Sequence, residues 1–111
     1  MKDGTYIARI DGRGVPSLVE PVMMSDGYWV SDDSGVSVHG KLNGRGLIDA
    51  LRLMDIESGE IVGVWESEGI RYIDRSYHFQ DKEEALKVGE SFSQIAIWDC
   101  ANSKALDIRY Q

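Results

Sequence analysis

The chain has 111 residues, of which 42% are hydrophobic, 12 are basic and 19 are acidic, and its formal net charge is -7 at pH 7. This length suits one domain with a single buried core. The acidic excess argues against binding to a nucleic-acid backbone, because phosphate contacts need clustered Lys and Arg side chains. Residues 1–56 hold 6 basic and 8 acidic residues, a net charge of -2, and residues 57–111 hold 6 basic and 11 acidic residues, a net charge of -5.

The cysteine content and the lack of long apolar runs indicate the cellular compartment of the protein. Cys100 is the single cysteine, so an internal disulfide is impossible and nothing points to an oxidising compartment. The first residues lack the apolar core of a signal peptide, and no apolar run approaches membrane-spanning length. We therefore expect a cytoplasmic protein with no membrane partner, and, since no low-complexity linker divides it, a single domain over residues 1–111.

The first forty residues have the pattern of short strands joined by turns. Residues 5–10 alternate as a strand, whereas two prolines make residues 15–24 an extended or edge segment. Residues 28–31 and 36–39 are short β-prone runs on either side of the turn-forming residues 32–35. We expect these two runs to form a β-hairpin.

Residues 47–55 fit two patterns. Leu47, Leu51 and Met54 recur at the spacing of a helical face, whereas Leu51 and Leu53 fit one face of a strand. We prefer the strand, because a turn and then a strongly β-prone run follow directly.

The flanks of this segment are clearer. Residues 41–46 predict a loop by their glycines and asparagine. Residues 61–65 predict a strand, and residues 70–74 predict a second strand that pairs with it through a turn at residues 66–69.

The clearest element is a helix over residues 82–92. Asp81 and Glu84 have the spacing of a capping box, and Ala85, Val88 and Phe92 lie on one apolar stripe. Acidic residues come first in this segment, which suits the helix dipole.

The chain then ends in a predicted hairpin over residues 95–109, with turn chemistry at residues 101–104. Residues 51–65 resemble this hairpin in sequence. A weak internal duplication is one explanation, but we favour two unrelated hairpins with similar turn chemistry. Together the elements predict an α+β fold, a mainly antiparallel β-sheet of hairpins with one principal helix (residues 82–92) packed on one face.

The residues able to support catalysis are few. His39 and His78 are the two histidines, and neither has the spacing of a metal site. Cys100, His78 and Asp81 could form a nucleophilic set, but nothing in their spacing selects it. We therefore predict no catalytic residue.

Metal and anion sites have equally weak support. Asp26, Asp32 and Asp33 offer oxygen ligands for calcium, yet they lack EF-hand spacing and fit turns. The Gly-Arg-Gly triplets at residues 12–14 and 44–46 could hold an anion, but the second lacks the Gly-Lys-Ser/Thr ending of a P-loop. We predict no metal and no cofactor.

Aromatic and acidic side chains point instead to binding. Tyr28 and Trp29 are neighbours in a predicted strand, so they must project from opposite faces, and one of them is a candidate exposed anchor. The acidic candidates for a partner surface are Glu57, Glu60, Glu66 and Glu68.

These residues predict a small, acidic, non-enzymatic binding or regulatory module that acts through contact with a protein partner or with a second copy of itself. One alternative is a ligand-binding domain or enzyme whose cleft combines Arg13 or Arg45 with His39 or His78. Another alternative is a structural subunit of a homo-oligomeric assembly.

Overall fold

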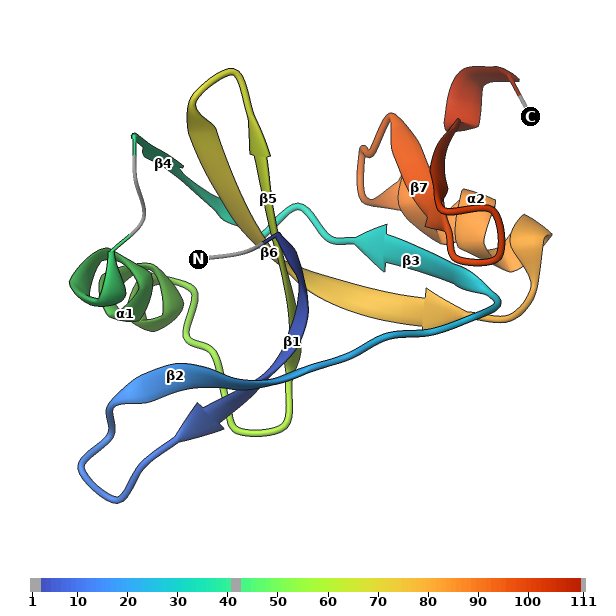
Figure 1. The fold of residues 1–111 in the computed structure, drawn as a ribbon. Coiled ribbons are helices and arrows are strands. Elements are labelled where there is room, and N and C mark those ends of the chain that lie inside the picture. The colour runs from blue at the N-terminus through green and yellow to red at the C-terminus, as the bar shows by residue number, and fades with distance from the viewer. Residues whose placement is uncertain (1–2, 41–42, 111) are drawn as a thin grey trace. The chain divides into compact units, whose positions relative to one another are not determined.

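The computed structural model describes residues 3–40 and 43–110, and within them the chain forms an α+β fold of eight antiparallel strands and two α-helices (Figure 1). In chain order the elements are β1 (Gly4–Ile10), β2 (Pro16–Pro21), β3 (Tyr28–Ser31), β4 (Val36–His39), α1 (Gly44–Leu53), β5 (Ile61–Ser67), β6 (Ile70–Phe79), α2 (Lys82–Ser91), β7 (Ala96–Asp99), β8 (Lys104–Asp107) and the 3₁₀ turn η1 (Ile108–Tyr110). The predicted fold class is confirmed. Neither helix of the described residues has the length and apolar content needed to cross a bilayer.

The chain divides into two compact units. The first unit comprises Met1–Val22 and Ser34–Arg75, and the second comprises Met23–Asp33 and Ser76–Gln111. Strand β6 therefore gives its first six residues to the first unit and its last four residues to the second.

The first unit is a five-stranded antiparallel sheet with α1 packed on one face. Its strand order is β2-β1-β5-β6-β4, with β2 and β4 at the edges. The prediction of an edge segment around the two prolines is confirmed by β2, whose ends are both prolines. The buried core consists of apolar side chains from α1, the loop after it and the three central strands: Ala8, Leu47, Ala50, Leu51, Met54, Ile56, Val62, Val64 and Ile73.

Helix α1 corrects the strand prediction for residues 47–55, and no hairpin forms over residues 51–65. The side chain of Asn43 accepts a hydrogen bond from the backbone N–H of Gly46 at 2.7 Å, which caps the first turn. Residues 44–46 therefore begin the helix, and the loop prediction is wrong there; residues 41–42 lie outside the described residues. Leu51 is fully buried, whereas Leu53 is 78% exposed, so the two leucines do not share a face.

Arg75 anchors the end of α1 to the sheet of the first unit. Its Nη2 donates to the backbone carbonyl of Met54 at 2.5 Å and to that of Asp55 at 3.3 Å. Its Nε donates to Oε1 of Glu60 at 2.9 Å, and its Nη1 donates to Oγ of Ser34 at 2.9 Å. One guanidinium thus satisfies carbonyls that the last turn of a helix leaves without intrahelical partners.

Strands β5 and β6 pair as the sequence predicts. Residue pairs run from Val62 with Arg75 to Ser67 with Ile70. The two connecting residues, Glu68 and Gly69, have φ values of 52° and 78°, the left-handed conformation that a type I′ hairpin turn requires.

The predicted hairpin between residues 28–31 and 36–39 is wrong, although both strands have the predicted bounds. β3 pairs with β6 and β7, and β4 pairs with β6. The ten-residue strand β6 offers partners to both short strands in succession, so residues 32–35 join two separate pairings rather than forming a hairpin turn.

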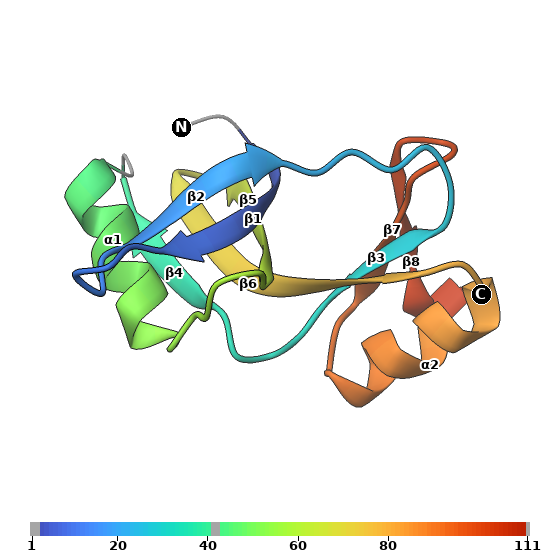
Figure 2. The same ribbon diagram turned by 90° about the horizontal axis from the view of Figure 1, so that it is seen from below.

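The second unit is a four-stranded antiparallel sheet with the order β6-β3-β7-β8. Helix α2 packs against β3 and β7 and covers one face of this sheet (Figure 2). The helix prediction is confirmed, and Asp81 caps it by accepting from the backbone N–H of Glu83 at 3.2 Å. The predicted terminal hairpin is confirmed by β7 and β8.

The core under α2 is formed by Val30, Ala85 and Ile97. Gly89 of the helix lies so close to the sheet that a Cβ there would be 3.0 Å from Cγ2 of Ile97. A small residue is therefore required where α2 crosses β7.

Candidate functional site

The face of the second unit's sheet opposite α2 bears a row of three aromatic side chains. Trp29 pairs directly with His78 on β6 and with Trp98 on β7. Directly paired residues of antiparallel strands project from the same face of the sheet. We call Trp29, His78 and Trp98 the aromatic row.

The aromatic row is partly open to solvent. Trp98 is 45% exposed, and Trp29 and His78 are half-buried. The rings of Trp29 and His78 meet edge to face, with centroids 5.0 Å apart and planes at 69°. Tyr28, by contrast, packs against the core under α2, so Tyr28 and Trp29 project from opposite faces of β3 as strand geometry requires.

His78 is held in place by the loop that precedes β3. Its Nε2 lies 2.8 Å from the backbone carbonyl oxygen of Asp26. Gly27 has φ of +76°, and a Cβ built there would lie 2.4 Å from Cε1 of His78 and 2.7 Å from the carbonyl oxygen of Phe79. Only glycine fits this contact, so the position of the His78 ring depends on Gly27 in the loop.

A bidentate ion pair lies on the same side of the sheet as the aromatic row. Ala105 on β8 pairs with Trp98, and Asp107 lies two positions further along on the same face. Nε of Arg109 donates to Oδ1 of Asp107 at 3.0 Å, and Nη2 donates to Oδ2 at 2.7 Å. These hydrogen bonds hold the pKa of Asp107 below its ordinary value of 3.8.

The first unit also carries an exposed tryptophan, Trp65, whose side chain contacts two residues of the same unit. Trp65 stacks on Tyr72 with ring centroids 4.3 Å apart, and its indole N–H donates to Oδ2 of Asp74 at 3.3 Å. Trp65 is 45% exposed, the same fraction as Trp98, which makes it a matched control for the aromatic row.

The four predicted acidic residues lie in the first unit. Glu60 accepts from Arg75, and Glu66 lies 3.3 Å from Arg71 in an ion pair. Glu57 is exposed beside a pocket, and Glu68 is exposed in the β5–β6 turn. Half of the predicted acidic surface is thus already paired with arginines of the same unit.

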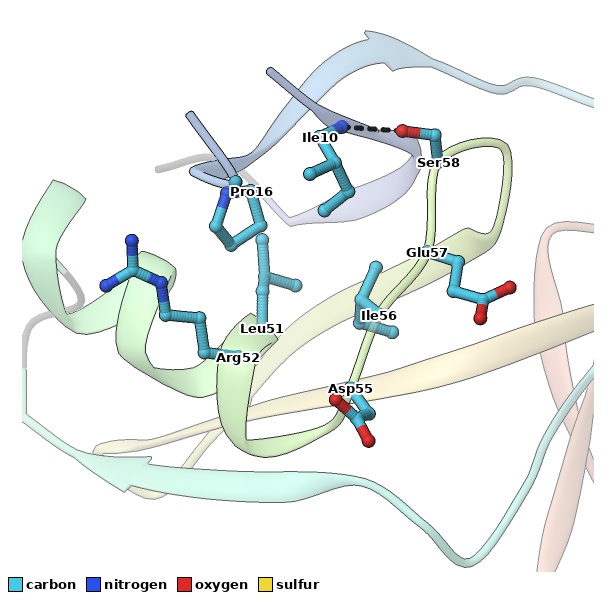
Figure 3. Close-up of a pocket in the computed structure, with 9 residues that line it drawn as sticks. Ile10, Pro16, Leu51, Arg52, Asp55, Ile56, Glu57 and Ser58 are labelled. Carbon is cyan, nitrogen blue, oxygen red and sulfur yellow. Dashed lines mark hydrogen bonds between the residues drawn. The ribbon is translucent and has the colours of Figure 1, made fainter. Parts of the chain in front are cut away.

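An open pocket of about 500 Å³ lies between the β1–β2 turn and the end of α1 (Figure 3). The lining side chains Ile10, Leu51 and Ile56 turn toward one another, and those of Asp55 and Glu57 point outward. The pocket lining contains Arg52 but neither histidine. The charged groups of the lining do not converge on one point. An active site requires polar groups that do converge.

The other residues of the predicted cleft lie apart from this lining. Arg13 is exposed in the β1–β2 turn, 3.7 Å from Asp11, and Arg45 is in the first turn of α1. His39 ends β4. Among the residues that the structure describes, the His, Cys, Asp and Glu side chains form no group of three suited to hold a metal ion.

Cys100 is buried at the end of β7, and its thiol is a poor nucleophile. Burial, followed by the carboxylates of Asp99 and Asp26, raises the pKa of Cys100 above its ordinary value of 9.0. We expect its reaction with a chromogenic disulfide reagent near pH 8 to be about 100-fold slower in native buffer than in denaturant, because thiolate and access are both limiting. A native-state reaction as fast as the denatured one would contradict this assignment.

Asp99 makes the β7–β8 turn sensitive to acid. Nδ2 of Asn102 donates to Oδ2 of the buried Asp99 at 2.7 Å, and this side-chain bond is the main cause that lowers the pKa of Asp99 below 3.8. Because the folded-state pKa lies below the unfolded one, the bond stabilises the fold above about pH 4 and is lost as pH falls through the folded pKa.

We therefore expect the urea midpoint to fall less for Asp99→Asn than for wild type between about pH 5 and about pH 3. Equal falls in the two proteins would contradict this role of Asp99.

No family model, no curated protein and no solved structure matches this chain. The sequence pointed to one of Tyr28 and Trp29 as an exposed anchor, but not to the rest of the aromatic row. Ile97 and Trp98 are neighbours in a predicted strand, as Tyr28 and Trp29 are, so the same alternation could have assigned Trp98 to an outer face.

Proposed function

We propose that the chain is a non-enzymatic binding module that contacts a protein partner through the aromatic row. The observation that carries this proposal is the row of Trp29, His78 and Trp98 on the sheet face that α2 leaves uncovered. Tryptophan supplies a large, rigid contact area and is enriched among the residues that dominate binding energy at interfaces.

The charges and the cysteine chemistry support the same function. The raised pKa of Cys100 disfavours nucleophilic catalysis, and the pocket of the first unit lacks converging polar groups. Glu57 and Glu68 add exposed negative charge, which contributes to the rate of association with a basic partner more than to affinity. The proposal includes a cytoplasmic location, since the single cysteine requires no oxidising compartment.

Affinity enrichment from an extract of the native host tests this function, with wild type, Trp98→Ala and Trp65→Ala as baits. We expect Trp98→Ala to lose the partner by about tenfold or more, the effect of removing an interface residue that dominates binding. Trp65→Ala, with the same exposed fraction, should retain the partner if circular dichroism shows that both variants are folded. Equal recovery by wild type and Trp98→Ala would overturn the proposal.

A further inference from the structure

We infer that the partner presents a positively charged segment whose arginine side chains stack on the aromatic row. This inference rests on the proposed function and names the chemistry of the partner. Three features of the second unit support it: its net charge, the absence of lysine from the strand face beneath the aromatic row, and the arginine that it already binds.

The second unit is the acidic part of the chain. Its residues, Met23–Asp33 and Ser76–Gln111, include nine acidic and four basic residues, a net charge of -5. The first unit, with ten acidic and eight basic residues, has a net charge of -2. A unit with this charge attracts a basic partner and repels both nucleic-acid phosphate and a second copy of itself.

On the side of the aromatic row, the basic side chain among the described residues of β8 and η1 is Arg109, which Asp107 binds, whereas the lysine of β8 projects from the other face. Lys104 pairs with Asp99, one position away from the pair of Ala105 with Trp98, and so projects toward the other face. Lys82 and Lys87 belong to α2, which covers that other face and also carries Glu83, Glu84 and Glu90. A cation approaching the aromatic row therefore meets no lysine on the strands beneath it.

The pair of Asp107 and Arg109 shows that this face can hold a guanidinium. Asp107 lies about 7 Å along β8 from the residue opposite Trp98, and it already accepts a two-pronged hydrogen bond from Arg109. An incoming arginine on the Trp98 ring would lie within reach of the same carboxylate. Arginine suits the site better than lysine, because its planar guanidinium stacks on aromatic rings and binds carboxylates with two hydrogen bonds.

Fluorescence titration with synthetic peptides tests this inference. Trp65→Phe removes the tryptophan of the first unit, so that emission reports on Trp29 and Trp98. We expect a decaarginine peptide to bind this protein about tenfold more tightly than decalysine, and decaglutamate to give no change.

Charge variants in the same background sharpen the test. Arg109→Gln removes the internal competitor for Asp107 and is expected to tighten decaarginine binding by about threefold, whereas Asp107→Asn should weaken it by about threefold. Lys87→Gln makes the same change of charge on α2 and should alter binding by less than about twofold. Adding Trp98→Ala should weaken binding by about tenfold.

Equal binding of decaarginine and decalysine, or equal effects of Arg109→Gln and Lys87→Gln, would overturn the inference. Sedimentation that shows self-association lost in Trp98→Ala would also overturn it, because the occupant would then be a second copy. Each of these three results would leave the enrichment experiment to judge protein binding separately.

Discussion

Replacing Leu51 by alanine is expected to lower the free energy of unfolding by about 3–4 kcal/mol. Leu51 is fully buried and lies in the core of the first unit with Val62, Val64 and Ile73. Truncation removes the transfer free energy of the lost methyl groups and leaves a cavity that a sheet and a helix packed together can fill only in part.

Urea denaturation of Leu51→Ala and Leu53→Ala tests this prediction and the helix together. Leu53 is 78% exposed at the end of α1, so its truncation should change the free energy of unfolding by less than about 0.5 kcal/mol. If both variants lowered the free energy of unfolding by similar large amounts, the helical assignment of α1 would be contradicted. Two leucines at i and i+2 share a face in a strand but not in a helix.

Replacing Gly27 by alanine is expected to lower the free energy of unfolding by about 2–4 kcal/mol. The residue has φ of +76°, and its Cβ would lie 2.7 Å from a backbone oxygen of Phe79, which cannot move without disturbing β6. The same Cβ would meet the ring of His78, so the variant should also displace the aromatic row.

Gly12→Ala is the matched control, because a Cβ at Gly12 would meet nothing within 4 Å and its φ is outside the positive range. Urea denaturation measures the loss of stability, and near-ultraviolet circular dichroism reports the surroundings of the aromatic side chains, those of Trp29 among them. A Gly27→Ala variant as stable as Gly12→Ala would show that the loop before β3 does not fix His78.

Local signals in the sequence were enough where an element is defined by its own residues. The cap at Asp81 and the apolar stripe after it specify α2, and glycine at position 69 allows the tight turn between β5 and β6. Local signals did not decide α1, because its leucines fit both helical and strand spacing. The Asn43 cap was present in the sequence and is the signal that favours the helix.

Pairings between distant segments could not be predicted. The hairpin expected between β3 and β4 fails because each strand finds a better partner in β6, and turn residues at 32–35 carry no information about that competition. The aromatic row depends on the same pairings, since His78 and Trp98 become neighbours of Trp29 only when β3 inserts between β6 and β7. Alternation along the strand could predict the face from which Trp29 projects. It could not predict which residues of other strands lie beside Trp29.

Binding of arginine-bearing partners by the aromatic row is tested most directly by the indole N–H signals in a ¹⁵N–¹H spectrum. The chain has 3 tryptophans, and each gives one such signal. On addition of decaarginine, the signals of Trp29 and Trp98 should shift together and saturate, whereas that of Trp65, bound to Asp74, should stay in place. Unmoved signals from Trp29 and Trp98, or a shift confined to Trp65, would contradict the claim.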